Sequence, residues 1–145
     1  MPSPEHEAEL ERVLSRAAEE CEVGAVWFGE GLPQLVKRAL EAAGKQLGSE
    51  PAKLALFEPG QADAPPANAE RVIVLSMAGL DELDAAVQSA REVKPRVARL
   101  ISAAAVLDFI PEGIRIRELG PALTAADIQR TLNTPLLAGP DLRPM

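Results

Sequence analysis

Glu58 is the side chain with the clearest potential for covalent chemistry. It follows the short apolar run at residues 54–57, which has the pattern of a strand buried in a parallel sheet. Ligands of open α/β sheets bind beyond the carboxyl ends of the strands, and a carboxylate in such a place can act as a covalent nucleophile. The other interpretation is a solvated loop glutamate before the turn Pro59-Gly60. The residues alone leave both open, so whether the chain is an enzyme stays undecided.

The turn Gly29-Glu30-Gly31 is the second group with chemical potential. It follows an apolar run at residues 25–28 and precedes a helical pattern. Backbone N–H groups at a helix N-terminus can bind an oxyanion or a phosphate, which makes Gly29 and Gly31 candidate cofactor-binding residues. The same residues also suit a tight strand-to-helix turn. Because Glu30 places a negative charge where an anion would lie, we favour the structural role.

Arg115 and Arg117 alternate with apolar residues at positions 114–119. This alternation predicts a strand that carries both guanidinium groups on one face. The two side chains could hold the phosphates of a nucleotide-like ligand. They could equally form a charged row that protects an exposed sheet edge from aggregation.

Metal and disulfide chemistry are not expected. Cys21 and His6 are the single cysteine and the single histidine, and they lie far apart in the sequence, so they cannot form a zinc site. The same scarcity disfavours Ser-His-Asp and Cys-His mechanisms. Cys21 falls on the apolar stripe of the predicted N-terminal helix, so we expect a small core residue there.

Composition limits the class of protein and of partner. The length of 145 residues predicts one domain, residues 1–145. A net charge of −7 and an aromatic content of 3% argue against nucleic acid as a partner. No apolar run approaches the length of a membrane span, and the acidic N-terminal residues differ from a signal peptide. We therefore expect a cytoplasmic protein with no membrane partner.

Strands and helices alternate through the first two thirds of the chain. Helices are expected to begin near Ser3-Pro4, Pro33, Asp81 and Thr124; strands are expected at residues 25–28, 54–57, 71–76, twice between 97 and 110, and at 114–119. The turn Pro111-Glu112-Gly113 predicts a hairpin, and the tail at 139–145 is expected to be extended. This order predicts an α/β fold: a compact, Rossmann-like, mainly parallel sheet with covering helices, and an antiparallel C-terminal hairpin at its edge.

The second half of the chain carries a family resemblance in four ordered segments. They read E-R-V-I-V-L at 70–75, V-A-R-L-I-S at 97–102, A-V-L-D-F at 105–109 and P-E-G-I-R-I-R-E-L at 111–119. In order and spacing they resemble the B (β) subunit of the coenzyme A transferases. The likeness extends to residue 136 through G-P-A-L-T at 120–124 and N-T-P-L at 133–136. It implies a CoA-transferase-like fold for the whole chain.

The first half resembles the same family at the two chemical positions. G-E-G-L-P at 29–33 is similar to the family's "G-I-G-L-P" turn, and F-E-P-G at 57–60 lies where the family has "S-E-N-G". The resemblance implies that Glu58 attacks an acyl-CoA thioester and forms a glutamyl-CoA thioester after an anhydride step. Coenzyme A is then a substrate and no cofactor is bound covalently. The implied partner is an A-subunit-like protein or a second copy of the chain.

A shortened segment supports the alternative, a catalytically inactive CoA-transferase-like fold that acts as a binding or assembly module. In the family a long glycine-rich segment that lines the CoA site follows "S-E-N-G", and here residues 61–69 take its place. Phe57 and Pro59 replace the Ser and Asn that flank the nucleophile. Both hypotheses keep the family's scaffold and differ in whether Glu58 reacts.

Overall fold

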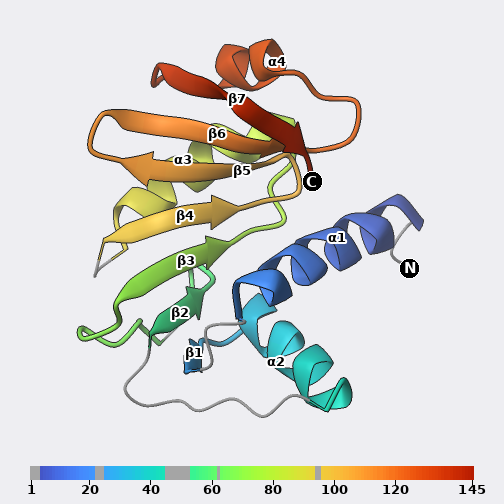
Figure 1. Cartoon of the computed structure of the whole chain (residues 1–145), viewed down its shortest axis with the longest axis vertical. Helices are drawn as coiled ribbons and strands as arrows, with labels where there is room; N and C mark the ends of the chain where they lie inside the picture. The colour runs from blue at the N-terminus through green and yellow to red at the C-terminus, as the bar shows by residue number, and fades with distance from the viewer. Residues whose placement is uncertain (1–3, 22–24, 45–52, 62, 94–95) are drawn as a thin grey trace.

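A mixed β-sheet is the centre of the structure, a computed structural model that describes residues 4–21, 25–44, 53–61, 63–93 and 96–145 (Figure 1). Within these residues seven strands pair in chain order, from β1 to β7. The elements are α1 (Pro4–Glu20), β1 (Val26–Phe28), α2 (Leu32–Ala42), β2 (Leu54–Phe57), β3 (Arg71–Leu75), the 3₁₀ turn η2 (Leu80–Glu82), α3 (Leu83–Arg91), β4 (Val97–Ile101), β5 (Ala105–Ile110), β6 (Gly113–Leu119), α4 (Ala125–Thr131) and β7 (Leu136–Pro144).

The strand directions confirm the expected α/β class. Strands β1 to β4 are parallel, β5 runs antiparallel to both neighbours, and β6 and β7 are again parallel. The hairpin of β5 and β6 is present, but its place at the sheet edge was predicted wrongly. Strand β7 pairs with β6 and becomes the edge, because α4 forms a crossover that returns the chain in the same direction. Arg115 and Arg117 therefore lie on an inner strand.

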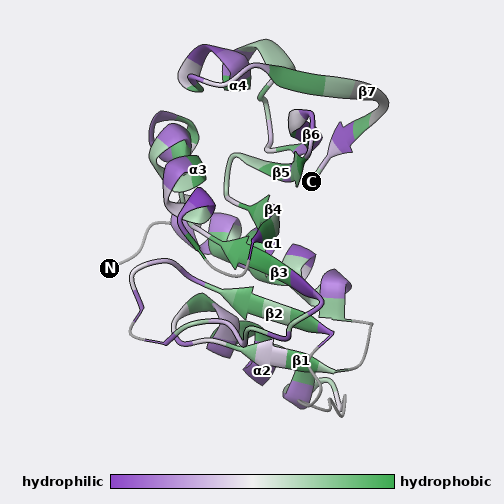
Figure 2. Ribbon diagram, turned by 90° about the vertical axis from the view of Figure 1, so that its left-hand side faces the viewer, coloured by the Kyte–Doolittle hydropathy of each residue, from purple (hydrophilic) through white to green (hydrophobic). Residues whose placement is uncertain are grey.

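Helices cover the two faces of the sheet in pairs. Helices α1 and α2 pack on one face, and α3 and α4 pack on the other (Figure 1). Neighbouring strand residues alternate between the faces: Leu56 and Ile73 contact the α1–α2 layer, whereas Ala55 and Val72 contact the α3–α4 layer. Burial on both faces explains why β2 and most of β3 are apolar, as their mainly green ribbons in Figure 2 show, whereas β4 carries the charged Arg99.

Local signals fixed some helix ends and not others. Thr124 caps α4 as predicted: the Asp127 N–H donates to Thr124 Oγ1 at 3.2 Å and the Thr124 N–H donates to Asp127 Oδ2 at 2.9 Å. The predicted cap at Asp81 was wrong, because this residue lies inside η2 and Glu82 precedes α3. The expected cap Ser3 lies outside the described residues.

None of the described helices is long and apolar enough to cross a bilayer.

Candidate functional site

The loops after β1 and β2 meet at the carboxyl edge of the sheet. The Gly29 N–H donates to the carbonyl of Leu56 at 3.0 Å, and the Glu30 N–H donates to Asp63 Oδ2 at 2.9 Å. The structure therefore brings Gly29, Gly31 and Glu58 together, although Gly31 and Glu58 are 27 positions apart in the sequence. This meeting follows from the parallel pairing of β1 with β2, which aligns the carboxyl ends of both strands.

The carboxylate of Glu58 is held by one of its two oxygens. The backbone N–H of Leu32, in the first turn of α2, donates to Oε2 at 3.3 Å, and Gln61 Nε2 donates to the same oxygen at 2.9 Å. None of the described residues donates to Oε1. The side chain is half-buried. Glu58 therefore has a fixed oxygen that faces a helix N-terminus, where negative charge is favoured, and a second oxygen that has no donor among the described residues.

Gly31 is required by this arrangement. Its φ angle is +84°, a conformation that side chains disfavour, and a Cβ atom at this position would lie 1.9 Å from Glu58 Oε2. Gly29 is also tightly packed, since a Cβ there would lie 3.2 Å from the carbonyl oxygen of Leu56. The N–H groups of Gly29 and Glu30 already have acceptors inside the protein. The geometry thus favours the structural role for this turn, with Gly31 making room for the carboxylate.

Two partners of the site were not anticipated from the sequence. Gln61 binds Glu58 and Asp63 binds the Glu30 N–H, and both follow the Pro59-Gly60 turn. The available signal was local: a turn brings the residues before and after it together, so a polar residue three positions after Glu58 was a natural candidate.

A second group of charged residues, here called the ionic cluster, lies between α1 and strands β4 to β6. Its side chains are only 4% to 15% exposed. Arg16 Nη2 lies 2.8 Å from Glu118 Oε2, Arg99 Nη2 donates to Asp108 Oδ2 at 3.1 Å, and Glu20 pairs with both arginines. The members are Arg16, Glu20, Arg99, Asp108 and Glu118.

Ion pairing in this cluster keeps the guanidinium groups charged. Burial by itself would lower the pKa of Arg16, but the hydrogen bond and the charge of Glu118 outweigh it and place the pKa above its ordinary value. The pKa of Arg99 is raised in the same way, with Asp108 as its main partner. Because every member is paired, the ionic cluster fixes α1 to the sheet and offers no open group for catalysis.

A β-bulge orients Glu118 toward α1. Leu107 is paired with Ile116 but the next residue back, Val106, is paired with Glu118, so Arg117 is an extra residue on β6. The bulge turns Glu118 to the face that holds Arg16. The sequence signal was the break in alternation at Arg117-Glu118.

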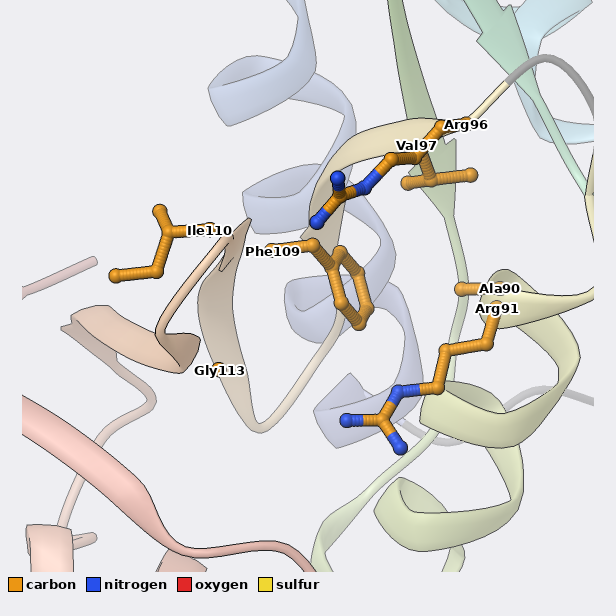
Figure 3. Close-up of a pocket in the computed structure, with 7 residues that line it drawn as sticks. All are labelled: Ala90, Arg91, Arg96, Val97, Phe109, Ile110 and Gly113. Carbon is orange, nitrogen blue, oxygen red and sulfur yellow. The ribbon is translucent and has the colours of Figure 1, made fainter.

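The described residues line at least three cavities, and none of these three includes Glu58. The cavity of Figure 3, about 160 Å³, lies at the amino edge of the sheet, where Arg91 and Arg96 flank the ring of Phe109. A cavity of about 500 Å³ lies at the carboxyl edge, below α1, and one of about 430 Å³ lies between α1 and the end of β7. Glu58 therefore lines none of these three cavities, and none of them can bring a ligand to its Oε1 atom.

Comparison with solved structures identifies proteins that share this architecture. The chain superimposes on the decarboxylase AibA/AibB with a TM-score of 0.64 and 14% identity, over 93% of this chain and 87% of that one. It superimposes on the acyl-CoA transferase YdiF of E. coli O157:H7, in a thioester complex with CoA, with a TM-score of 0.63 and 15% identity. The protein has a coenzyme A transferase-like fold.

The extent of the likeness differs between these structures. The match to the acyl-CoA transferase covers 94% of this chain and 42% of that chain, so the CoA-transferase-like fold seen here spans less than half of the larger enzyme. No protein-family model matches the sequence, and no curated protein matches it either. At such low identity the likeness establishes the fold, and the chemistry must be argued from the site.

Proposed function

We propose that this chain is a B-subunit-like component of an acyl-CoA transferase, with Glu58 as the nucleophile. The observation that carries the proposal is the asymmetry of the Glu58 carboxylate. Two donors hold Oε2, whereas Oε1 has no donor among the described residues. A carboxylate held in this way presents one oxygen for attack in a fixed direction.

The first half of the reaction would proceed in two steps, and the second half would repeat them in reverse with another carboxylate. Glu58 Oε1 attacks the thioester carbonyl of an acyl-CoA, the C–S bond breaks, and an acyl-glutamyl anhydride and CoA thiolate form. The thiolate then attacks Cδ of Glu58, and the free carboxylate leaves as a glutamyl-CoA thioester forms. A second carboxylate reverses these steps and departs as the new acyl-CoA, so that no proton, oxidant or metal is consumed.

The two groups that donate to Oε2 of Glu58 can stabilise the second step, the attack of the CoA thiolate on Cδ. When the thiolate attacks Cδ, negative charge develops on Oε2, which already accepts hydrogen bonds from Gln61 at 2.9 Å and from the Leu32 N–H at 3.3 Å. Donors that are in place before charge develops stabilise such an oxyanion by about 3 kcal/mol each. Gln61 is therefore a positioning and charge-stabilising residue in this proposal.

A partner chain belongs to the proposal. None of the three described cavities includes Glu58, so we propose that an A-subunit-like protein or a second copy completes the acyl-CoA site. A cytoplasmic location, where CoA thioesters are abundant, is part of the same proposal. Light scattering of the chain alone and with a candidate A subunit measures the association; a strict monomer under both conditions contradicts this part.

Trapping tests the nucleophile directly. The protein is incubated with succinyl-CoA or acetyl-CoA, with and without a candidate A subunit, and treated with hydroxylamine or borohydride. Trypsin releases residues 54–71 as one peptide that contains Glu58 and Glu70. We expect modification of Glu58 and none of Glu70, which is the internal control. Glu58→Gln should abolish the adduct, and Gln61→Ala should slow its formation about 100-fold.

A second function is favoured by one observation, the position of Glu58 at the start of α2. Gly31 provides no side-chain cap for this helix, and Glu58 supplies the missing acceptor. In a non-catalytic binding or assembly module this would be the residue's whole role. Absence of any adduct on Glu58, together with a loss of about 1 kcal/mol of unfolding free energy in Glu58→Ala, would support the module and overturn the enzyme.

A further inference from the structure

The cavity of about 500 Å³ below α1 has the position and the size of a ligand site. Its walls come from Arg12 on α1, Gly79 and Leu80 after β3, Ala103 and Ala104 after β4, and Leu123 after β6. Strands β3, β4 and β6 all end at this edge, where ligands of α/β sheets bind. The volume lies within the range of small-molecule pockets, roughly 300–1,000 Å³.

Arg12 is the positively charged side chain in this cavity, and its guanidinium group can donate hydrogen bonds to a ligand. Its Nη2 donates to the carbonyl of Ala103 at 2.9 Å. Its Nε is buried out of a ligand's reach and has no acceptor among the described residues, whereas Nη1, from which none of these residues accepts either, is the donor left for a ligand. Buried donors without a partner are rare in proteins. Arg12 thus differs from Arg16, one helical turn further on, whose carboxylate partners are part of the ionic cluster.

The remaining lining restricts what can bind. Leu80, Leu123 and the two alanines present an apolar wall, which suits an aliphatic chain. Glu9 is the second charged side chain of the cavity, and no ion pair joins it to Arg12 within the described residues. Arg12 and Glu9 carry opposite charges, so a bound monoanion leaves one net negative charge in the cavity and a bound dianion leaves two. The lining therefore selects a monoanion over a dianion.

We propose that this cavity binds an aliphatic monocarboxylate, with the carboxylate on Arg12 and the chain against Leu80 and Leu123. A planar carboxylate matches the forked donors of a guanidinium. This site is separate from Glu58 and is expected to be present whether or not Glu58 reacts.

Calorimetric titration of the full chain with hexanoate tests the proposal. Hexanoate should saturate one site, whereas hexanamide, which has the same shape without the charge, and adipate, which has a second charge, should each bind at least about tenfold more weakly. Equal binding of hexanoate and hexanamide, or no saturation by hexanoate, would overturn it.

Three variants locate the site. Arg12→Ala should remove hexanoate binding, and Arg96→Ala, which removes a guanidinium from the cavity of Figure 3, should leave it unchanged. Gly79→Leu should also abolish binding, because a Cβ atom at Gly79 meets no atom within 4 Å and its side chain can occupy the cavity without disturbing the backbone. Retained binding in both Arg12→Ala and Gly79→Leu would place hexanoate elsewhere and refute the proposal.

Discussion

The two faces of the sheet are held to their helices by different forces. On the α3–α4 face the buried contacts are aliphatic, with Leu83, Val87 and Ile128 fully buried. On the α1 face an apolar patch is joined by the ionic cluster, in which Arg16 and Arg99 bind three carboxylates. Aliphatic contacts tolerate substitution by groups of similar volume, whereas a buried charge requires its own partner. We therefore expect substitutions in the ionic cluster on the α1 face to lower the free energy of unfolding more than substitutions on the α3–α4 face.

The largest effect is expected from breaking the ionic cluster at Arg99. Arg99→Met leaves Asp108 and Glu20 without their shared partner, and loss of one member of a buried pair costs about 4 kcal/mol. Urea denaturation measures the change in unfolding free energy. Arg38→Met, at an exposed position on α2, is the matched control and should change stability little. A loss below about 1 kcal/mol in Arg99→Met would show that the cluster is mere surface charge.

A somewhat smaller effect is expected on the aliphatic face. Leu83→Ala removes a fully buried side chain of α3 and should cost about 3 kcal/mol, through lost burial and the cavity it leaves. Leu137→Ala on β7, where the side chain is 44% exposed, is the control. If Leu83→Ala proved as mild as Leu137→Ala, the α3 layer would not be part of the cooperative core.

Cys21 reports separately on the α1 face. Burial, followed by the charge of Glu20, raises the pKa of its thiol from 9.0 to about 12. The protonated thiol should react very slowly with thiol reagents at mildly alkaline pH. Its contribution to stability is complete below pH 9.0 and is lost as the pH rises toward 12. Labelling should accelerate more in Arg99→Met than in Leu83→Ala; equal acceleration would mean that both faces open together.

The smallest effect on stability is expected at Asp127, in the first turn of α4 on the surface of the α3–α4 face. The backbone hydrogen bond with Thr124, aided by its side chain and by Arg130, lowers the pKa of Asp127 below 3.8. A lowered pKa means that the charged carboxylate stabilises the fold above this range and that the contribution fades as the pH falls through the folded-state pKa. Asp127→Asn should therefore slightly lower the melting temperature at neutral pH and be nearly silent in strong acid. A difference that persists in acid would contradict the assignment.

Local patterns in the sequence predicted much of the fold. The strand at residues 54–57, the hairpin and the Thr124 cap each depend on neighbours within a few residues, and all three are observed. The likeness to CoA transferases predicted the same fold that the solved structures share. The sequence singled out Glu58 and Gly31 separately, and the structure brings them together; the roles suggested for them remain proposals.

Features decided by distant partners were not predictable in this way. Strand β7 contains Gly139, Pro140 and Asp141, a composition unfavourable for a strand interior, and it forms because β6 offers an unpaired edge. The contact of Arg16 with Glu118 spans 102 residues and depends on the bulge at Arg117. No window of sequence around either residue contains that information.

The pairing of Arg16 with Glu118 also sets an order of events during synthesis. Helix α1 leaves the ribosome before its main acidic partner on the sheet, which is made 102 residues later. At about 5–20 residues per second this is a delay of roughly 5–20 s. Throughout that interval Arg16 lacks its buried partner Glu118, although α2, which shares an apolar cluster with Val13 and Ala17, has already been made. The ionic cluster can therefore close only after α1 has waited for β6, and the fixing of this helix to the sheet by charge is among the later events of folding during synthesis.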